Sequence, residues 1–283
     1  MIWVLLCVLA GTAFGHIMRS AQLRQCAMSW VGAWNYLVAA GSCWLWWALQ
    51  SGRHLGWEAA ILGSLSGFAL VTAYFLMNPA IRAAGVGVTQ SIQWLGISLP
   101  IAASILIWRE IPTAVQALGL LLALIALPLL ACGHGAPGAS KHRWKLLILA
   151  GLFLLEGLVS LAMKFYSRQA APGSESTLAF LCFLFSGAAA GNVLIAARQA
   201  RAGLRDITHG VSMGISNVLC NFAFLQALAL LPGTIVFPTI SAGSIVMTAT
   251  VGALLWRERY YGRSLAGLIL AAIALILINL PPL

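Results

Sequence analysis

Apolar residues follow one another along this chain in long stretches, and charged residues or Gly/Pro clusters separate each stretch from the next. A helix needs about 20 predominantly apolar residues to cross the hydrocarbon core of a bilayer. Stretches of roughly this length occur at residues 2–18, 29–49, 56–77, 86–107, 113–132, 146–163, 177–197, 208–231, 233–256 and 261–280. The pattern predicts an all-α membrane protein with ten transmembrane helices.

The second half of the chain repeats a feature of the first. Trp108-Arg109-Glu110 ends the fourth stretch, and Trp256-Arg257-Glu258 ends the ninth, 148 residues later. Because five is an odd number of spans, two such repeats enter the membrane in opposite senses, as in many secondary transporters. The sequence therefore predicts two inverted-topology repeats of five helices, at 1–135 and 146–283, joined by a linker at 136–145.

Composition excludes most classes of soluble protein. Hydrophobic residues make up 61% of the chain and charged residues only 8%, whereas soluble domains carry roughly 25% charge. The net charge of +10 does not indicate nucleic-acid binding, because the Lys and Arg residues lie between apolar stretches and form no basic run. The six cysteines show no metal-ligand spacing, so we expect neither a metal site nor a cofactor.

These features resemble the drug/metabolite transporter superfamily, and most closely its EamA-like members. The resemblance covers the whole chain, and its most specific pieces are the two Trp-Arg-Glu motifs and the segment at 221–238. Such relatives export amino acids and other metabolites, take up sugars, exchange nucleotide sugars or move lipid-linked sugars. The resemblance implies transport of a small molecule without naming it. We expect a multi-pass protein of the bacterial cytoplasmic (inner) membrane, as a monomer or homodimer in the lipid bilayer.

Loop charges predict the orientation. Twelve of the sixteen Lys and Arg residues fall in the odd-numbered loops between the predicted spans, and four fall in the even-numbered loops. Positively charged loops stay in the cytoplasm, so both termini are predicted to lie outside. The family resemblance favours the opposite orientation, because many relatives have both termini inside.

Helix-breaking residues mark two corresponding spans. The fourth span contains Gly96 and Pro100, and the ninth contains Pro238 and Gly243. Proline removes a helical hydrogen bond, and breaks on matching helices of inverted repeats indicate a binding site near the middle of the membrane. The alternative is that these residues only let helices pack closely.

Uncharged polar side chains near these breaks are candidates for binding a solute. Amides are costly in hydrocarbon unless they face water or a polar partner, although Ser and Thr also bond between helices and Trp94 also suits plain packing. The predicted substrate-binding residues are Gln90, Gln93, Trp94, Asn217, Asn221, Thr239 and Ser241. They suit an uncharged polar or zwitterionic solute.

One carboxyl group lies among apolar residues. Glu156 is near the centre of the sixth span, where inserting a charge costs about 2.5–3.5 kcal/mol and functional use is the first hypothesis. It is predicted to couple transport to protons or a cation, with a structural hydrogen bond as the alternative. An alignment of Ala10-Gly11 with Ala150-Gly151 places His16 opposite Glu156 and makes it a second coupling candidate.

The predicted function is secondary active transport of a small polar or amphiphilic metabolite such as an amino acid, by an exporter that is proton-coupled or an exchanger. One alternative is a flippase for a lipid-linked sugar. Another is an intramembrane enzyme, but the chain has no HExxH motif and no paired Asp. We therefore predict no catalytic residues and no enzymatic activity.

Overall fold

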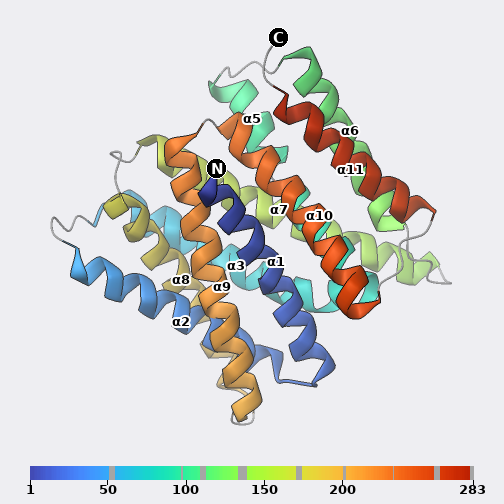
Figure 1. The fold of residues 1–283 in the computed structure, drawn as a ribbon. Helices are drawn as coiled ribbons and strands as arrows, with labels where there is room; N and C mark the ends of the chain where they lie inside the picture. The colour runs from blue at the N-terminus through green and yellow to red at the C-terminus, as the bar shows by residue number, and fades with distance from the viewer. Residues whose placement is uncertain are drawn as a thin grey trace. The chain divides into compact units, whose positions relative to one another are not determined.

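The computed structural model describes residues 1–50, 55–96, 98–108, 113–132, 139–169, 174–199, 202–231, 233–257 and 262–280. The regular secondary structure of these residues is entirely α-helical (Figure 1). The helices are α1 (Ile2–Leu23), α2 (Met28–Leu49), α3 (Trp57–Ala84), α4 (Val86–Leu95), α5 (Ser98–Trp108), α6 (Ala114–Cys132), α7 (Ala139–Gln169), α8 (Ser174–Ala196), α9 (Leu204–Leu230), α10 (Gly233–Trp256) and α11 (Arg263–Asn279). The all-α prediction is confirmed for the described residues.

Six described helical segments are long and apolar enough to cross a membrane. They are Ile2–Leu23, Trp57–Ala84, Trp144–Tyr166, Thr177–Ala196, Leu204–Leu230 and Thr239–Trp256. Their length and composition indicate an integral membrane protein. The other helices follow the remaining predicted stretches, and the span predicted at 86–107 is divided between α4 and α5.

One predicted helix break and several predicted helix boundaries were wrong. The predicted break at Pro238 and Gly243 does not occur, because α10 is continuous through both residues. The third span was predicted to end at residue 77, but helix α3 continues through Pro79 to Ala84 and carries Arg82 in its last turn. Helix α7 begins at Ala139, inside the predicted linker, and extends to Gln169, past the predicted end of the sixth span at residue 163.

Local hydrogen bonds define where two helices begin. At the start of α6, the Thr113 N–H donates to Gln116 Oε1 (3.0 Å) and the Gln116 N–H donates to Thr113 Oγ1 (3.3 Å). This reciprocal pair is a capping box, which satisfies two N–H groups that the first helical turn leaves without partners. At the start of α9, the carboxylate of Asp206 accepts a hydrogen bond from the Gly203 N–H (2.8 Å). This bond corresponds to the one from the Thr113 N–H to Gln116 in the capping box of α6.

The chain forms two compact units, which do not coincide with the sequence halves. Unit 1 contains residues 1–74 and 162–230, and unit 2 contains residues 75–161 and 231–283. Each unit therefore combines helices from both predicted repeats.

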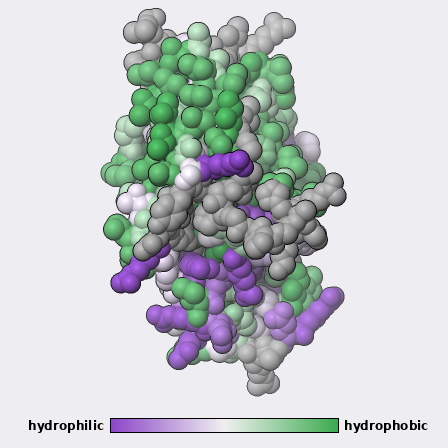
Figure 2. All heavy atoms as spheres, turned by 90° about the vertical axis from the view of Figure 1, so that its right-hand side faces the viewer, coloured by the Kyte–Doolittle hydropathy of each residue, from purple (hydrophilic) through white to green (hydrophobic). Residues whose placement is uncertain are grey.

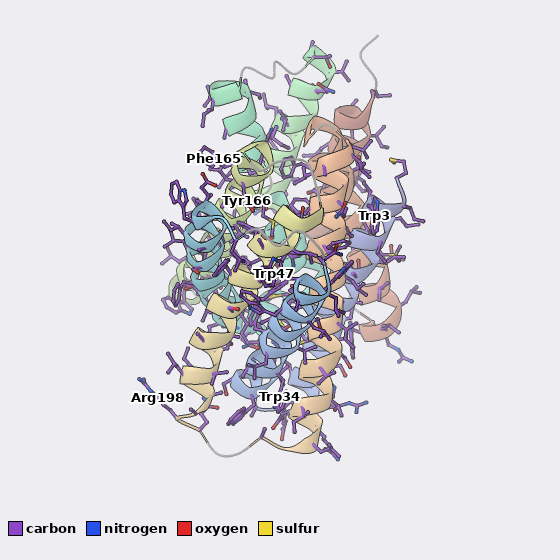
Figure 3. The ribbon with its side chains drawn as sticks, turned by 90° about the vertical axis from the view of Figure 1, so that its left-hand side faces the viewer. Trp3, Trp34, Trp47, Phe165, Tyr166 and Arg198 are labelled. Atoms are coloured by element: carbon purple, nitrogen blue, oxygen red, sulfur yellow. The ribbon has the colours of Figure 1, made fainter. Side chains whose placement is uncertain are left out.

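In unit 1, α2 packs against α8 and α9, and α1 packs against α9. Glycines allow the close approach of α2 and α9. A Cβ atom added at Gly210 would lie 2.8 Å from the carbonyl oxygen of Val31, and one added at Gly214 would lie 2.7 Å from that of Asn35. Figure 3 shows Arg198 projecting at the lower end of this unit, with Trp34 closer to that end than Trp47.

In unit 2, α6 packs against α11, and α10 packs against α4 and α11. Residues 148 positions apart have matching burial in these pairs. Ala126 on α6 and Ala274 on α11 are 0% and 1% exposed, and the neighbouring Ile125 and Ile273 are 43% and 42% exposed. Val88 on α4 and its counterpart Val236 on α10 are both fully buried.

Large apolar side chains are exposed along the helices. On α7, Leu147, Leu154 and Leu158 form an exposed stripe at helical spacing. Hydrophobic residues also cover large areas of the face drawn in Figure 2 (green). Contiguous apolar surface of this kind marks contact with a membrane or another protein, and the six long apolar helices favour the membrane.

Candidate functional site

The side chains of Gln93 and Glu156 meet in unit 2. Gln93 Nε2 donates a hydrogen bond to Glu156 Oε2 (3.0 Å), which joins α4 to α7. The sequence predicted these residues independently, Gln93 for solute binding and Glu156 for coupling. The structure therefore brings together two polar side chains that lie 63 residues apart.

A contact between glycines positions this pair. A Cβ atom added at Gly96 would lie 2.6 Å from the Phe153 carbonyl oxygen and 3.1 Å from the Gly157 nitrogen. A Cβ atom added at Gly157 would lie 2.8 Å from the Gly96 oxygen. Only glycine allows the two backbones to come this close. Gln93 lies one turn before Gly96 and Glu156 directly precedes Gly157, so the glycine contact holds their side chains in range.

The interruption between α4 and α5 occurs next to this contact. The Gly96 N–H donates to the carbonyl oxygens of Ile92 (3.3 Å) and Gln93 (3.0 Å), and α5 begins at Ser98. This is the break that Gly96 and Pro100 predicted on the fourth span. It lies three residues from Gln93, so the candidate site is at an irregular part of the backbone, where membrane proteins often bind ions and solutes.

Helix α10, which packs against α4, contributes two further candidates. Ser241 is buried and Thr239 is half-buried, and both belong to unit 2. Ser241 corresponds to Gln93 at the offset of 148. Ser244 and Thr248 continue the buried face of α10 at helical spacing, and both are fully buried. Neither was among the binding residues predicted from the sequence. The side chains of Gln90 and Trp94 lie outside the described part of the structure.

Asn217 and Asn221 lie in unit 1, where they meet a residue that sequence analysis missed. Asn217 Nδ2 donates to Asn35 Oδ1 on α2 (3.2 Å), and Asn221 Nδ2 donates to Asn217 Oδ1 (2.8 Å). Asn35 carried the same signal as the other two, a primary amide within an apolar stretch. The predicted cavity shared by glutamines and asparagines would join the two units and stays a prediction.

His16 is buried in unit 1, on α1. Its predicted counterpart Glu156 belongs to unit 2. The pairing of the two residues therefore also concerns both units and stays a prediction.

A Cys–His–Asp group lies near the start of α9, but its geometry does not suit a nucleophile. Cys26 Sγ lies 3.9 Å from His209 Nδ1, which is 2.8 Å from the Arg205 carbonyl oxygen. A carbonyl oxygen can only accept, so Nδ1 carries its proton and cannot take one from the thiol. Asp206 accepts from the Ala27 N–H (2.9 Å). Burial, followed by the Asp206 charge, raises the pKa of the Cys26 thiol. The thiol therefore stays protonated and weakly nucleophilic.

Comparison with known proteins identifies no family, since no family model matches the chain. A Haemophilus influenzae protein described as uncharacterized is 26% identical over 213 residues, covering 74% of this chain and 72% of its own. The chain also superposes on the crystal structure of a protein with a TM-score of 0.69 over 99% of both chains, at 13% identity. This likeness shows the fold alone. The structure of another protein with this fold is therefore known. The likeness says nothing about the chemistry of this chain.

Proposed function

We propose that this protein is a secondary active transporter of a small polar or amphiphilic metabolite, proton-coupled or an exchanger, of the drug/metabolite transporter type. The observation that carries the proposal is the Gln93–Glu156 hydrogen bond at the break between α4 and α5. A carboxyl group inside an apolar helix is expensive unless it has a use, and coupling a solute to a proton is such a use.

Matching burial in unit 2 supports the proposed inverted repeat. Two helices related by a two-fold axis bury the same positions, and Ala126 on α6 and Ala274 on α11 are equally buried. The packing of α2 on α8 and of α4 on α10 also pairs spans that correspond in the two predicted repeats. Self-paired helices of this kind are expected where inverted repeats interlock.

The proposed mechanism uses the two protonation states of Glu156. When ionised, the carboxylate accepts a hydrogen bond from Gln93 and favours water or a cation beside it. When protonated, it is neutral, and its O–H can donate to the Gln93 oxygen or to a solute. A solute that competes with the proton gives exchange, and a solute that requires the proton gives symport.

Transport in proteoliposomes tests this proposal. Wild-type protein and Glu156→Gln are reconstituted, a pH gradient is imposed, and accumulation is measured by mass spectrometry for a defined mixture of amino acids, nucleosides and monosaccharides. We expect the wild type to accumulate at least one compound. We expect accumulation by Glu156→Gln to be at least about tenfold lower than by the wild type, because the amide retains the volume of the carboxyl group but cannot titrate. The variant should still exchange the compound across the membrane.

The control is Glu58→Gln, which changes a carboxyl group in the first turn of α3. This variant should accumulate the compound as the wild type does. Undiminished gradient-driven accumulation by Glu156→Gln would show that Glu156 is structural.

A further inference from the structure

The three asparagines of unit 1 form a hydrogen-bonded chain with a defined direction. Asn221 Nδ2 donates to the main-chain oxygen of Asn217 (3.0 Å) as well as to its Oδ1 (2.8 Å). Because a carbonyl oxygen can only accept, the nitrogen of Asn221 is identified. Asn217 must then accept through Oδ1 and donate through Nδ2 to Asn35 (3.2 Å). This chain of hydrogen bonds therefore ends at Asn35 Nδ2, which is a donor.

This terminal donor has no partner among the described residues. Asn35 is 0% exposed, and its Nδ2 makes no hydrogen bond. Most buried side-chain polar atoms have a partner, so each exception requires an explanation. Reversing the amide of Asn35 does not remove the problem, because its nitrogen would then face the nitrogen of Asn217.

A buried acceptor without a partner lies close by. Asn192 on α8 is also 0% exposed, and its Nδ2 donates to the Ala188 carbonyl oxygen (3.1 Å), which identifies Oδ1 as the remaining atom. Among the described residues, Asn192 Oδ1 makes no hydrogen bond. Donor and acceptor thus occur as a complementary pair of atoms, both buried in unit 1.

Gly32 connects the two positions. A Cβ atom added at Gly32 would lie 2.5 Å from Asn192 Oδ1 and 2.6 Å from the ring of Tyr74. Asn35 follows Gly32 by three residues on α2, a spacing that places Cβ positions about 5–6 Å apart. Asn192 Oδ1 therefore lies beside the helical turn that carries Asn35. A side chain at position 32 would collide with this oxygen.

We infer that Asn35 and Asn192 together form a recognition site for one uncharged group that both accepts and donates a hydrogen bond, such as the primary amide or hydroxyl of the transported solute. The inference rests on the proposed transport function and names the chemistry of its solute. Asn35 donates to the oxygen of this group, and Asn192 Oδ1 accepts its hydrogen. The surroundings favour a neutral group, because the neighbouring side chains of Tyr36 and Tyr74 are buried aromatics.

Two other arrangements satisfy the same atoms and are outcomes of the test. A buried water has the same hydrogen-bonding chemistry as a solute hydroxyl. Alternatively, Asn35 donates directly to Asn192, and the pair is purely structural. The three cases differ in what removal of the acceptor does to stability and to binding.

Asn192→Leu is the discriminating variant. Leucine has the same number and branching of side-chain heavy atoms as asparagine and removes a buried acceptor that has no partner among the described residues, while the Ala188 carbonyl keeps its place in the helix. For a solute site, we expect the melting temperature in detergent to rise by about 2–4 °C. We expect binding to weaken at least about fivefold. For a direct bond to Asn35, the melting temperature must fall instead.

Binding is measured by affinity selection with mass spectrometry on purified protein. The probe is an equimolar mixture of amino acids, their primary amides, their N,N-dimethylamides and monosaccharides. We expect the wild type to enrich primary amides or monosaccharides over dimethylamides, since the latter accept a hydrogen bond but cannot donate one. Asn35→Asp provides a second variant, which keeps the acceptor for Asn217 and replaces the donor by an oxygen. It should also lose the enrichment.

Ser216→Ala is the matched control. Ser216 is buried next to Asn217, and its hydroxyl donates to the Ala10 carbonyl oxygen (2.6 Å). This variant should lower the melting temperature without changing the enriched compounds. Equal enrichment by wild type and Asn192→Leu would overturn the inference, and enrichment of nothing by the wild type would leave water as the occupant. Neither result depends on gradient-driven accumulation in proteoliposomes, which tests the transport function separately.

Discussion

Several polar residues of this protein owe their properties to neighbours that are distant in sequence. Glu156 has only apolar neighbours along the chain, and its hydrogen-bond partner is Gln93 on another helix. Cys26 lies in the short connection between α1 and α2, and its environment comes from the start of α9. The ionisation of such residues therefore reports on packing as well as on residue type.

The reactivity of Cys26 tests its environment at the residue scale. Its pKa is raised mainly by burial and further by Asp206, so the thiolate fraction at pH 8 is smaller than for an ordinary cysteine. With the other five cysteines replaced, the rate of alkylation by iodoacetamide should have its pH midpoint above that of an ordinary exposed cysteine. Asp206→Asn should lower this midpoint, because it removes a negative charge.

Arg24→Gln supplies a control of opposite sign, since the Arg24 charge lowers the pKa of Cys26. The pH midpoint of alkylation in this variant should lie above that of the protein in which only Cys26 is retained. Midpoints that do not respond to either charge would contradict the described packing of this connection against the start of α9.

At the scale of helices, glycines determine which elements come close. Gly96 and Gly157 bring the end of α4 against α7, and Gly210 and Gly214 bring α9 against α2. Small residues have this role in membrane proteins because helices there associate by close packing and not by the hydrophobic effect. The candidate sites in both units lie beside these contacts.

Gly157→Ala tests the contact in unit 2. The new methyl group would lie 2.8 Å from the Gly96 oxygen, so α4 and α7 must move apart. We expect a loss of about 1–3 kcal/mol in the free energy of unfolding, together with reduced gradient-driven transport, because Gln93 no longer reaches Glu156. Thermal unfolding in detergent and proteoliposome uptake measure the two effects.

Gly41→Ala is the control for this prediction. Gly41 also lies inside a helix, α2, but a Cβ atom there would have nothing within 4 Å. Alanine should therefore be neutral or stabilise the protein by up to about 1 kcal/mol through its helix propensity. Equal effects at positions 41 and 157 would contradict the specific contact between α4 and α7.

At the scale of the molecule, loop charges bear on orientation. Arg24, Arg198 and Arg205 are exposed near helix ends of unit 1, and all three belong to the loops predicted to be cytoplasmic. From these charges, the positive-inside rule predicts that both termini lie outside. We predict that alkaline phosphatase fused after Leu283 is active in a bacterial host and that green fluorescent protein fused there is dark. Fluorescence of the latter fusion would reverse the predicted orientation.

The apolar stretches alone were sufficient to predict a helical membrane protein, because hydrocarbon forces each backbone segment to satisfy its own hydrogen bonds. Gly96 and Pro100 likewise predicted the break between α4 and α5. Pro238 misled the same reasoning, since a proline inside a helix is tolerated when its surroundings satisfy the freed carbonyl, and the surroundings are not visible in a local pattern.

Tertiary structure decided which polar residues act together. The sequence identified Gln93, Glu156, Asn217 and Asn221 as unusual in apolar helices, since the cost of a polar group in hydrocarbon depends on residue type. It did not pair Gln93 with Glu156 or select Asn35 and Asn192, because a hydrogen bond depends on distances of about 3 Å between helices that the sequence separates widely. Those distances arise from glycine contacts, and only the folded chain shows which glycines meet.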